Sequence, residues 1–277
     1  RICGLRPQTG VLMALLFHDD DYDLRTRQTG FRRYRQLLSF YGFHWWKVGM
    51  LTLLGSLPLV IGIVLSVLYS SLLILLPASL LGGMILGPFL AALYDAVMRG
   101  LRYSPDNQWR CYLRSWKQNG KASLLPGALL GLLLGSYAFM FYVAWVLNLR
   151  QDARSVIACL LSGLLLILIN TLYWPQLVLF ELSGFDRIRN IILFSAKYFW
   201  RVLGVTLLQL FYWGLYLLFA PWSLLLLPLL GVWFIVFLSE LLLYDRLDAE
   251  LKINERFLEL EGAPFEDETD TENPDTF

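Results

Sequence analysis

Three acidic residues, each near the end of a long apolar run, are the first candidates for chemistry. Asp95 follows GPFLAALY, Glu181 follows WPQLVLF and Glu240 follows VWFIVFLS. Acids at the edge of a membrane are costly unless they are paired or hydrated. One interpretation is a ring of acids that faces the cytoplasm and binds a cation or a proton. The other is local pairing, since Asp95 lies four residues before Arg99, a favourable helical spacing.

Two amide side chains lie deeper within apolar runs. Asn170 follows LLLILI, and Gln209 follows GVTLL. Amides in a membrane commonly form hydrogen bonds between helices, worth about 1 kcal/mol each. A contact with a transported substrate is the alternative, and the sequence leaves both open.

Signatures of enzymes and of bound cofactors are absent from the sequence. It contains no Ser-His-Asp grouping, HExxH, P-loop or dinucleotide fingerprint. Its three cysteines are scattered, and His18 and His44 are its two histidines. We therefore predict no enzymatic activity, no cofactor and no metal site. The net charge of +1 gives no electrostatic case for nucleic acid.

Long apolar runs must position these groups. The run from Val48 to Leu76 carries no charge, and a bilayer core of about 30 Å needs only about 20 apolar residues as a helix. The chain has 277 residues, of which 57% are hydrophobic and 16% charged, whereas soluble domains carry about 25% charged residues. The sequence predicts an all-α polytopic membrane protein.

Six spans make up a transmembrane domain at 31–245, and Pro77 is expected to end the first. A polar segment at 1–30 precedes this domain. A cytoplasmic amphipathic helix at 246–261 and a disordered acidic tail at 262–277 follow it. The expected spans are about 48–76, 79–98, 124–147, 156–180, 200–219 and 222–244.

Glycines recur every fourth residue in the second and third spans. They are Gly83 and Gly87 in the second span, and Gly127, Gly131 and Gly135 in the third. Small residues at this spacing let two helix backbones approach closely. We expect these two spans to pack through their glycine faces.

Basic and aromatic residues precede three of the spans, beginning with FRRYRQLLSFYGFHWWK at 31–47. Such segments are typical of interfacial helices that lead into a membrane. They are candidates for binding anionic lipid headgroups or for docking a protein partner, and generic topology signals are the alternative. The candidate residues are Arg110, Arg114, Trp116, Lys117, Trp200 and Arg201.

The distribution of Lys and Arg predicts the orientation. They concentrate before span one, between spans two and three, and between spans four and five. By the positive-inside rule, both termini are expected in the cytoplasm. Each basic segment leads into an outgoing span, and an acid lies on the returning span. This common order suggests three helical hairpins with interfacial elbow helices, related by a pseudo-threefold axis.

The stretch from Leu86 to Gly135 contains LGPFLAALYDAVMRG, then SWKQN, then a Gly-rich span. In these features it resembles the YesL-like family of bacterial integral membrane proteins, over about residues 31–245. The resemblance implies the bacterial cytoplasmic membrane and an accessory role in carbohydrate uptake, with subunits of an ABC importer as partners.

Two functional hypotheses follow. The first is a non-enzymatic accessory or scaffold protein. The alternative is a small-solute, ion or lipid transporter or channel that uses the acids facing the cytoplasm. The sequence leaves the ligand and the oligomeric state open.

Overall fold

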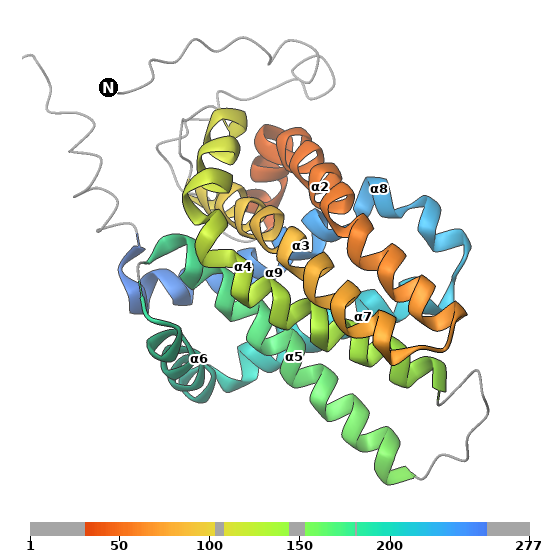
Figure 1. Cartoon of the computed structure of the whole chain (residues 1–277). Helices are drawn as coiled ribbons and strands as arrows, with labels where there is room; N and C mark the ends of the chain where they lie inside the picture. The colour runs from red at the N-terminus through yellow and green to blue at the C-terminus, as the bar shows by residue number, and fades with distance from the viewer. Residues whose placement is uncertain (1–30, 103–107, 144–152, 181, 254–277) are drawn as a thin grey trace, which may run out of the picture.

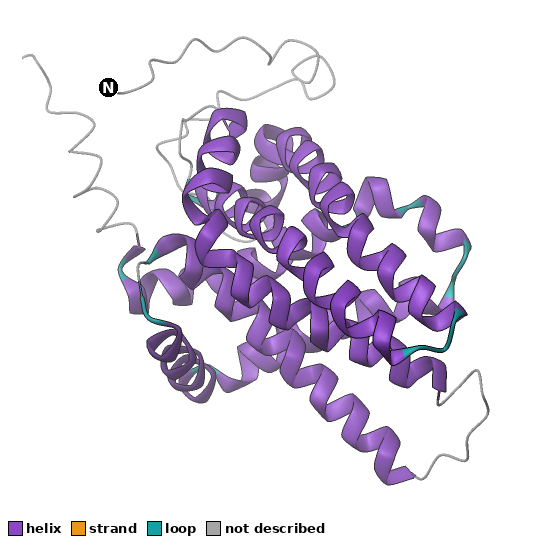
Figure 2. Ribbon diagram, viewed as in Figure 1, coloured by secondary structure: helices purple, strands orange, loops and turns teal. Residues whose placement is uncertain are grey.

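The structure, a computed structural model, describes residues 31–102, 108–143, 153–180 and 182–253. Within these ranges the chain forms helices joined by short turns, with no strand (Figure 2). The expected segments at 1–30 and 262–277 lie outside the described residues. In chain order the helices are α2 (Phe31–Leu68), α3 (Leu72–Leu101), α4 (Gln108–Phe141), α5 (Ala153–Leu179), α6 (Gly184–Lys197), α7 (Phe199–Leu218), the 3-10 helix η2 (Trp222–Leu225), α8 (Leu227–Leu230) and α9 (Val232–Leu251).

Six helical segments in the described part are long and apolar enough to cross a membrane. They are Phe31–Leu68, Leu72–Leu101, Tyr112–Phe141, Ile157–Leu179, Phe199–Leu218 and Leu227–Leu251. Large apolar side chains on them point outward, among them Leu54, Leu161 and Leu217. Such a surface is stable against lipid tails and unfavourable in water. The expected all-α polytopic membrane fold is confirmed, and Figure 1 shows the long helices packed side by side.

The turn between the first two spans differs from the expectation. Pro77 does not end the first span, because α2 stops at Leu68 and Pro77 lies inside α3. The charge-free part of α2, from Val48 to Leu68, already measures about 30 Å at 1.5 Å per residue, which matches the bilayer core. Ser70, with φ of 47°, then reverses the chain. Proline is tolerated in membrane helices where neighbouring helices compensate for the lost hydrogen bond.

Two of the three expected elbow helices are continuous with their spans. The segment 31–47 is the first part of α2, and the residues before span three form the start of α4. α4 continues through Gly120 and Pro126, which lie at the second junction. In Figure 1 the first turns of α4, in yellow, run at an angle to the rest of that helix. The third elbow is separate: Tyr198, with φ of −114° and ψ of 34°, ends α6 before α7 begins.

The later spans need smaller corrections. The expected spans 156–180 and 200–219 agree with α5 and α7 to within a few residues. α4 ends at Phe141, and residues 144–147 of the expected third span lie outside the described part of the chain. The last span is not one helix from 222, because η2 and α8 precede α9. The amphipathic helix expected at 246–261 is, as far as it is described, the last part of α9. That helix ends at Lys252, which adopts a left-handed conformation.

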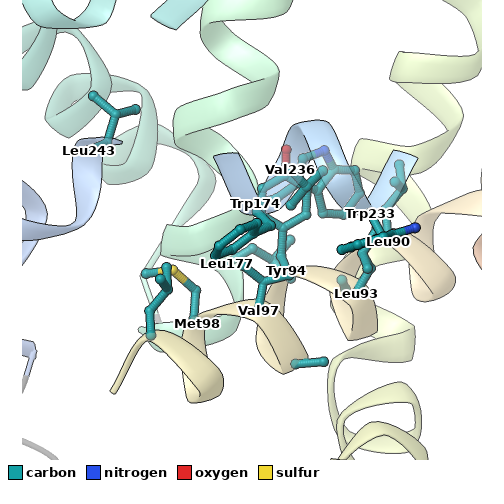
Figure 3. Packing of buried hydrophobic residues seen from close by; sticks show 14 of the residues in the cluster. Leu90, Leu93, Tyr94, Val97, Met98, Trp174, Leu177, Trp233, Val236 and Leu243 are labelled. Carbon is teal, nitrogen blue, oxygen red and sulfur yellow. The ribbon is translucent and has the colours of Figure 1, made fainter. Parts of the chain in front are cut away.

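The middle of the bundle is formed by α3. Every residue from Ala91 to Met98 is buried, and α3 contacts α2, α4, α5 and α9. Figure 3 shows Tyr94 of α3 packed beside Trp174 of α5 and Val236 of α9. The Tyr94 and Trp174 rings stack with their centroids 6.4 Å apart.

The three expected hairpins are not alike in their contacts. Helices α2 and α3 pack extensively against each other, but α4 contacts its expected partner α5 only lightly. Instead α4 packs along α3, from a different hairpin. The pseudo-threefold arrangement stays a prediction.

Candidate functional site

The two glycine rows face each other across the interface between α3 and α4. A Cβ atom added at Gly131 would lie 2.6 Å from the Cα of Gly83, and one at Gly127 would lie 2.7 Å from the Cα of Gly87. Real Cβ atoms essentially never make contacts this short. The backbones of α3 and α4 therefore touch, as the four-residue spacing predicts.

Gly135 continues this interface toward the start of α3. A Cβ there would lie 2.9 Å from the Cβ of Ser79. Because five glycines and a serine hold the two backbones at contact distance, the position of α4 along α3 is fixed.

The acids have different environments in the structure. Asp95 forms an ion pair with Arg99, with 3.0 Å between Oδ2 and Nε. This contact agrees with the local-pairing interpretation of Asp95. Glu181 lies outside the described residues, so the proposed three-acid ring has two members whose positions are described.

Glu240 differs from Asp95. It is fully buried, and neither carboxylate oxygen has a hydrogen-bond partner among the described residues. It interacts electrostatically with Tyr94 of the central helix α3. A buried polar group without a partner costs about 1–3 kcal/mol, so Glu240 reduces the stability of the fold as described. An unpartnered buried acid is a candidate functional group.

Gln209 joins three helices. Its Nε2 donates hydrogen bonds of 2.8 Å to Thr171 Oγ1 of α5 and of 2.8 Å to Ser239 Oγ of α9. This buried amide of α7 makes the interhelical hydrogen bonds expected of it. Asn170 instead accepts a hydrogen bond from Trp174 Nε1 within α5.

An arginine that sequence reasoning treated as a topology signal is buried. Arg33 is only 4% exposed. Its Nη1 donates to Asp245 Oδ1 of α9 at 2.7 Å, and its Nη2 donates to the Leu101 carbonyl of α3 at 3.4 Å. It also lies over the Tyr244 ring, 5.4 Å from the centroid. These contacts join the start of α2 to the ends of α3 and α9. The pairing of Arg33 with Asp245 depends on tertiary structure and leaves no local spacing signal.

The basic–aromatic candidates lie at the starts of α4 and α7. Arg114, Trp116 and Lys117 of α4 are exposed, and Trp116 packs edge-on against Phe89, with ring centroids 6.0 Å apart. On α7, Arg201 is exposed and Trp200 is 81% exposed. The side chain of Arg110 lies outside the described part. No contact between the α4 group and the α7 group is seen among the described residues.

The amphipathic helix α6 is fastened to α9. Lys197 Nζ donates to Glu250 Oε1 at 2.5 Å, and Tyr198 Oη donates to the same oxygen at 2.6 Å. The hydrogen bond to Glu250 raises the pKa of Lys197. The apolar residues Phe185 and Ile192 of α6 are exposed. Since α6 connects two membrane spans, these side chains are placed to enter the lipid interface.

Among the described residues, no group of three or more His, Cys, Asp or Glu side chains gathers that could hold a metal ion. Comparison of the chain with protein-family models, with curated proteins and with solved structures gives no match.

Proposed function

We propose that this chain is a non-enzymatic accessory or scaffold protein of the bacterial cytoplasmic membrane. The observation that carries the proposal is the set of exposed basic and aromatic side chains on a closely packed bundle. Trp116 and Lys117 are exposed near the start of α4, and Trp200 and Arg201 are exposed near the start of α7. Exposed Trp and Arg are the residue types most enriched at the energetic centres of protein interfaces.

The packing of the core supports a scaffold. The central part of α3, from Ala91 to Met98, is buried on all sides, and the glycine contacts hold α4 against it. A transporter needs elements that move relative to one another. Movement of α4 along α3 would separate backbones that are now in contact, at the cost of their van der Waals packing.

The orientation with both termini in the cytoplasm belongs to this proposal. The contact between Arg33 and Asp245 places the start of α2 and the end of α9 at the same end of the bundle. Basic residues lie before the membrane-spanning part of α4 and before α7. The positive-inside rule assigns such segments to the cytoplasm. The exposed Trp and Arg side chains would then face cytoplasmic proteins or the inner headgroups.

The partner class is a subunit of a carbohydrate ABC importer, as the resemblance to the YesL-like family implies. A photoreactive residue at Trp116 or Trp200, in the full chain in native membranes, tests this. The matched control is the same residue at Leu160, which is exposed on the apolar surface of α5. We expect Trp116 and Trp200 to crosslink to an importer subunit identified by mass spectrometry, and Leu160 to crosslink only to lipid. Lipid crosslinks alone from all three positions would contradict the proposal.

One observation favours the alternative, a transporter or channel. Glu240 is fully buried without a hydrogen-bond partner in the described part of the chain, and intramembrane acids often mark ion or proton pathways. Proteoliposomes containing a pH-sensitive dye, with an imposed potassium potential, measure proton flux directly. Flux that is lost in Glu240→Gln but kept in Asp248→Asn would support transport. Flux equal to that of protein-free vesicles would exclude proton transport by this route.

A further inference from the structure

A cavity of about 310 Å³ lies between the first half of α2 and the start of α4. It is lined by His44, Lys47, Val48 and Trp109. The lining thus combines a cation, an imidazole and an indole. Lys47 is exposed, Trp109 is 45% exposed, and His44 is half-buried. Asp95, Asn170, Gln209 and Glu240 are not among the described residues that line this cavity.

Among the described residues, no acid compensates the positive charge in this cavity. Lys47 forms no ion pair with any acid among the described residues, and its contact there is with the Phe43 ring, 4.4 Å from Nζ to the centroid. His44 Nδ1 is buried and has no hydrogen-bond partner in the same part of the chain. A cavity that contains an unpaired ammonium favours an anionic ligand.

The position of the cavity along α2 indicates how deep in the membrane the cavity lies. Lys47 directly precedes the charge-free stretch that begins at Val48, and the basic start of α4 supplies Trp109. The cavity therefore lies at the level where lipid headgroups meet the apolar core, on the side with most of the basic residues.

The surface beside the cavity suits acyl chains. Leu54 and Ile61 follow Lys47 by one and two heptads, so the three residues share one face of α2. Leu54 is 57% exposed and Ile61 is 55% exposed. A lipid whose phosphate contacts Lys47 would place an acyl chain against Leu54 and Ile61 on this apolar face of α2. A soluble phosphate would make no contact with this apolar face.

We propose that the cavity formed by His44, Lys47 and Trp109 binds the phosphate headgroup of an anionic phospholipid, with an acyl chain along Leu54 and Ile61. Basic pockets between transmembrane helices are suited to such headgroups, since each Lys contributes both charge and hydrogen-bond donors. The site is distinct from the proposed partner surface, because its lining residues do not include Trp116, Lys117, Trp200 or Arg201.

Native mass spectrometry of the full chain in a mild detergent tests the site, with phosphatidylglycerol titrated against phosphatidylcholine. We expect one saturable phosphatidylglycerol adduct that phosphatidylcholine does not replace. Lys47→Gln should weaken this adduct roughly fivefold, the effect of one cation near an anionic headgroup. The matched control is Lys121→Gln, which removes an exposed lysine of α4 that does not line the cavity.

Several outcomes would overturn the assignment. Equal losses in Lys47→Gln and Lys121→Gln would mean that general surface charge holds the lipid. Displacement of the adduct by millimolar glycerol phosphate would identify a soluble ligand. Lys47→Arg keeps the charge and should keep the adduct, so failure of that folded variant to bind would also contradict the proposal. Unchanged thermal unfolding of each variant shows that a lost adduct reflects the site.

Discussion

Gly83 of α3 and Gly131 of α4 meet so closely that no other residue fits at either position without displacement. A Cβ at Gly131 would lie 2.6 Å from the Cα of Gly83, and one at Gly83 would lie 2.8 Å from the Cα of Gly131. The relationship is reciprocal, and the obstacle on each side is backbone. A flexible side chain could move aside, whereas here one whole helix must move away from the other.

Gly131→Leu should therefore destabilise the protein by about 1–3 kcal/mol or more, the usual cost of overpacking. Thermal unfolding in detergent, followed by circular dichroism, measures this. Gly214→Ala is the control, because a Cβ at Gly214 meets nothing within 4 Å. Alanine has the higher helix propensity, so the control should keep or raise the melting temperature. An unchanged melting temperature for Gly131→Leu would contradict the glycine interface.

Gln209 should contribute measurable coupling between α7 and α9. Gln209→Leu removes two interhelical hydrogen bonds, and the expected cost is about 0.6–1.7 kcal/mol. Thr171 and Ser239 each still donate to a carbonyl of their own helix, so neither hydroxyl loses its only partner. A double-mutant cycle with Ser239→Ala isolates the shared bond. Strict additivity of the two substitutions would show that the bond contributes nothing.

Glu240 and Asp95 should respond in opposite directions when replaced by apolar residues. Glu240→Met removes a buried carboxyl without a hydrogen-bond partner in the described part, so stability should stay equal or rise by about 1–3 kcal/mol. Asp95→Leu breaks the ion pair with Arg99, and the expected loss lies between about 1 kcal/mol for exposed pairs and about 3 kcal/mol for buried ones. Denaturant unfolding measures the stability of both variants. If Glu240→Met destabilises the protein as much as Asp95→Leu does, Glu240 has a hydrogen-bond or ion-pair partner.

The attachment of α6 to α9 should depend on Glu250 and on pH. The hydrogen bond to Glu250 raises the pKa of Lys197. The contribution of Lys197 is therefore fully present below the ordinary lysine pKa and is lost as the pH rises through the raised value. The same hydrogen bond lowers the pKa of Glu250, so the contribution of Glu250 is lost as the pH falls through that lowered value. Glu250→Gln should speed hydrogen exchange in α6 at neutral pH. The control, Arg189→Gln, removes an exposed charge from the same helix and should leave exchange unchanged. Equal exchange in both variants would contradict this attachment.

Features set by local sequence were predictable. The length and composition of the apolar runs identified six spans, because a bilayer imposes both. The spacing of Asp95 and Arg99, and that of the glycines, specified which groups share a helix face. Those predictions required no knowledge of how distant segments meet.

Features set by tertiary contacts were not predictable. Asp95 and Glu240 occupy similar positions in sequence, but Asp95 has a cation four residues away and Glu240 has no ion pair with any described residue. Pro77 was expected to end a helix, although its effect depends on neighbours that the sequence does not reveal. Arg33 was counted as a topology signal, and its burial follows from Asp245, more than two hundred residues away.

The glycine face of α3 has a consequence for synthesis and insertion. α3 leaves the ribosome before α4, so Gly83 and Gly87 meet lipid or the insertion machinery until Gly127 and Gly131 have been made. During that interval the first helical pair presents a shallow backbone groove with no protein to fill it. Chains whose synthesis stops after α3 and before α4 would expose this groove permanently. Membrane quality control should remove these truncated chains fastest.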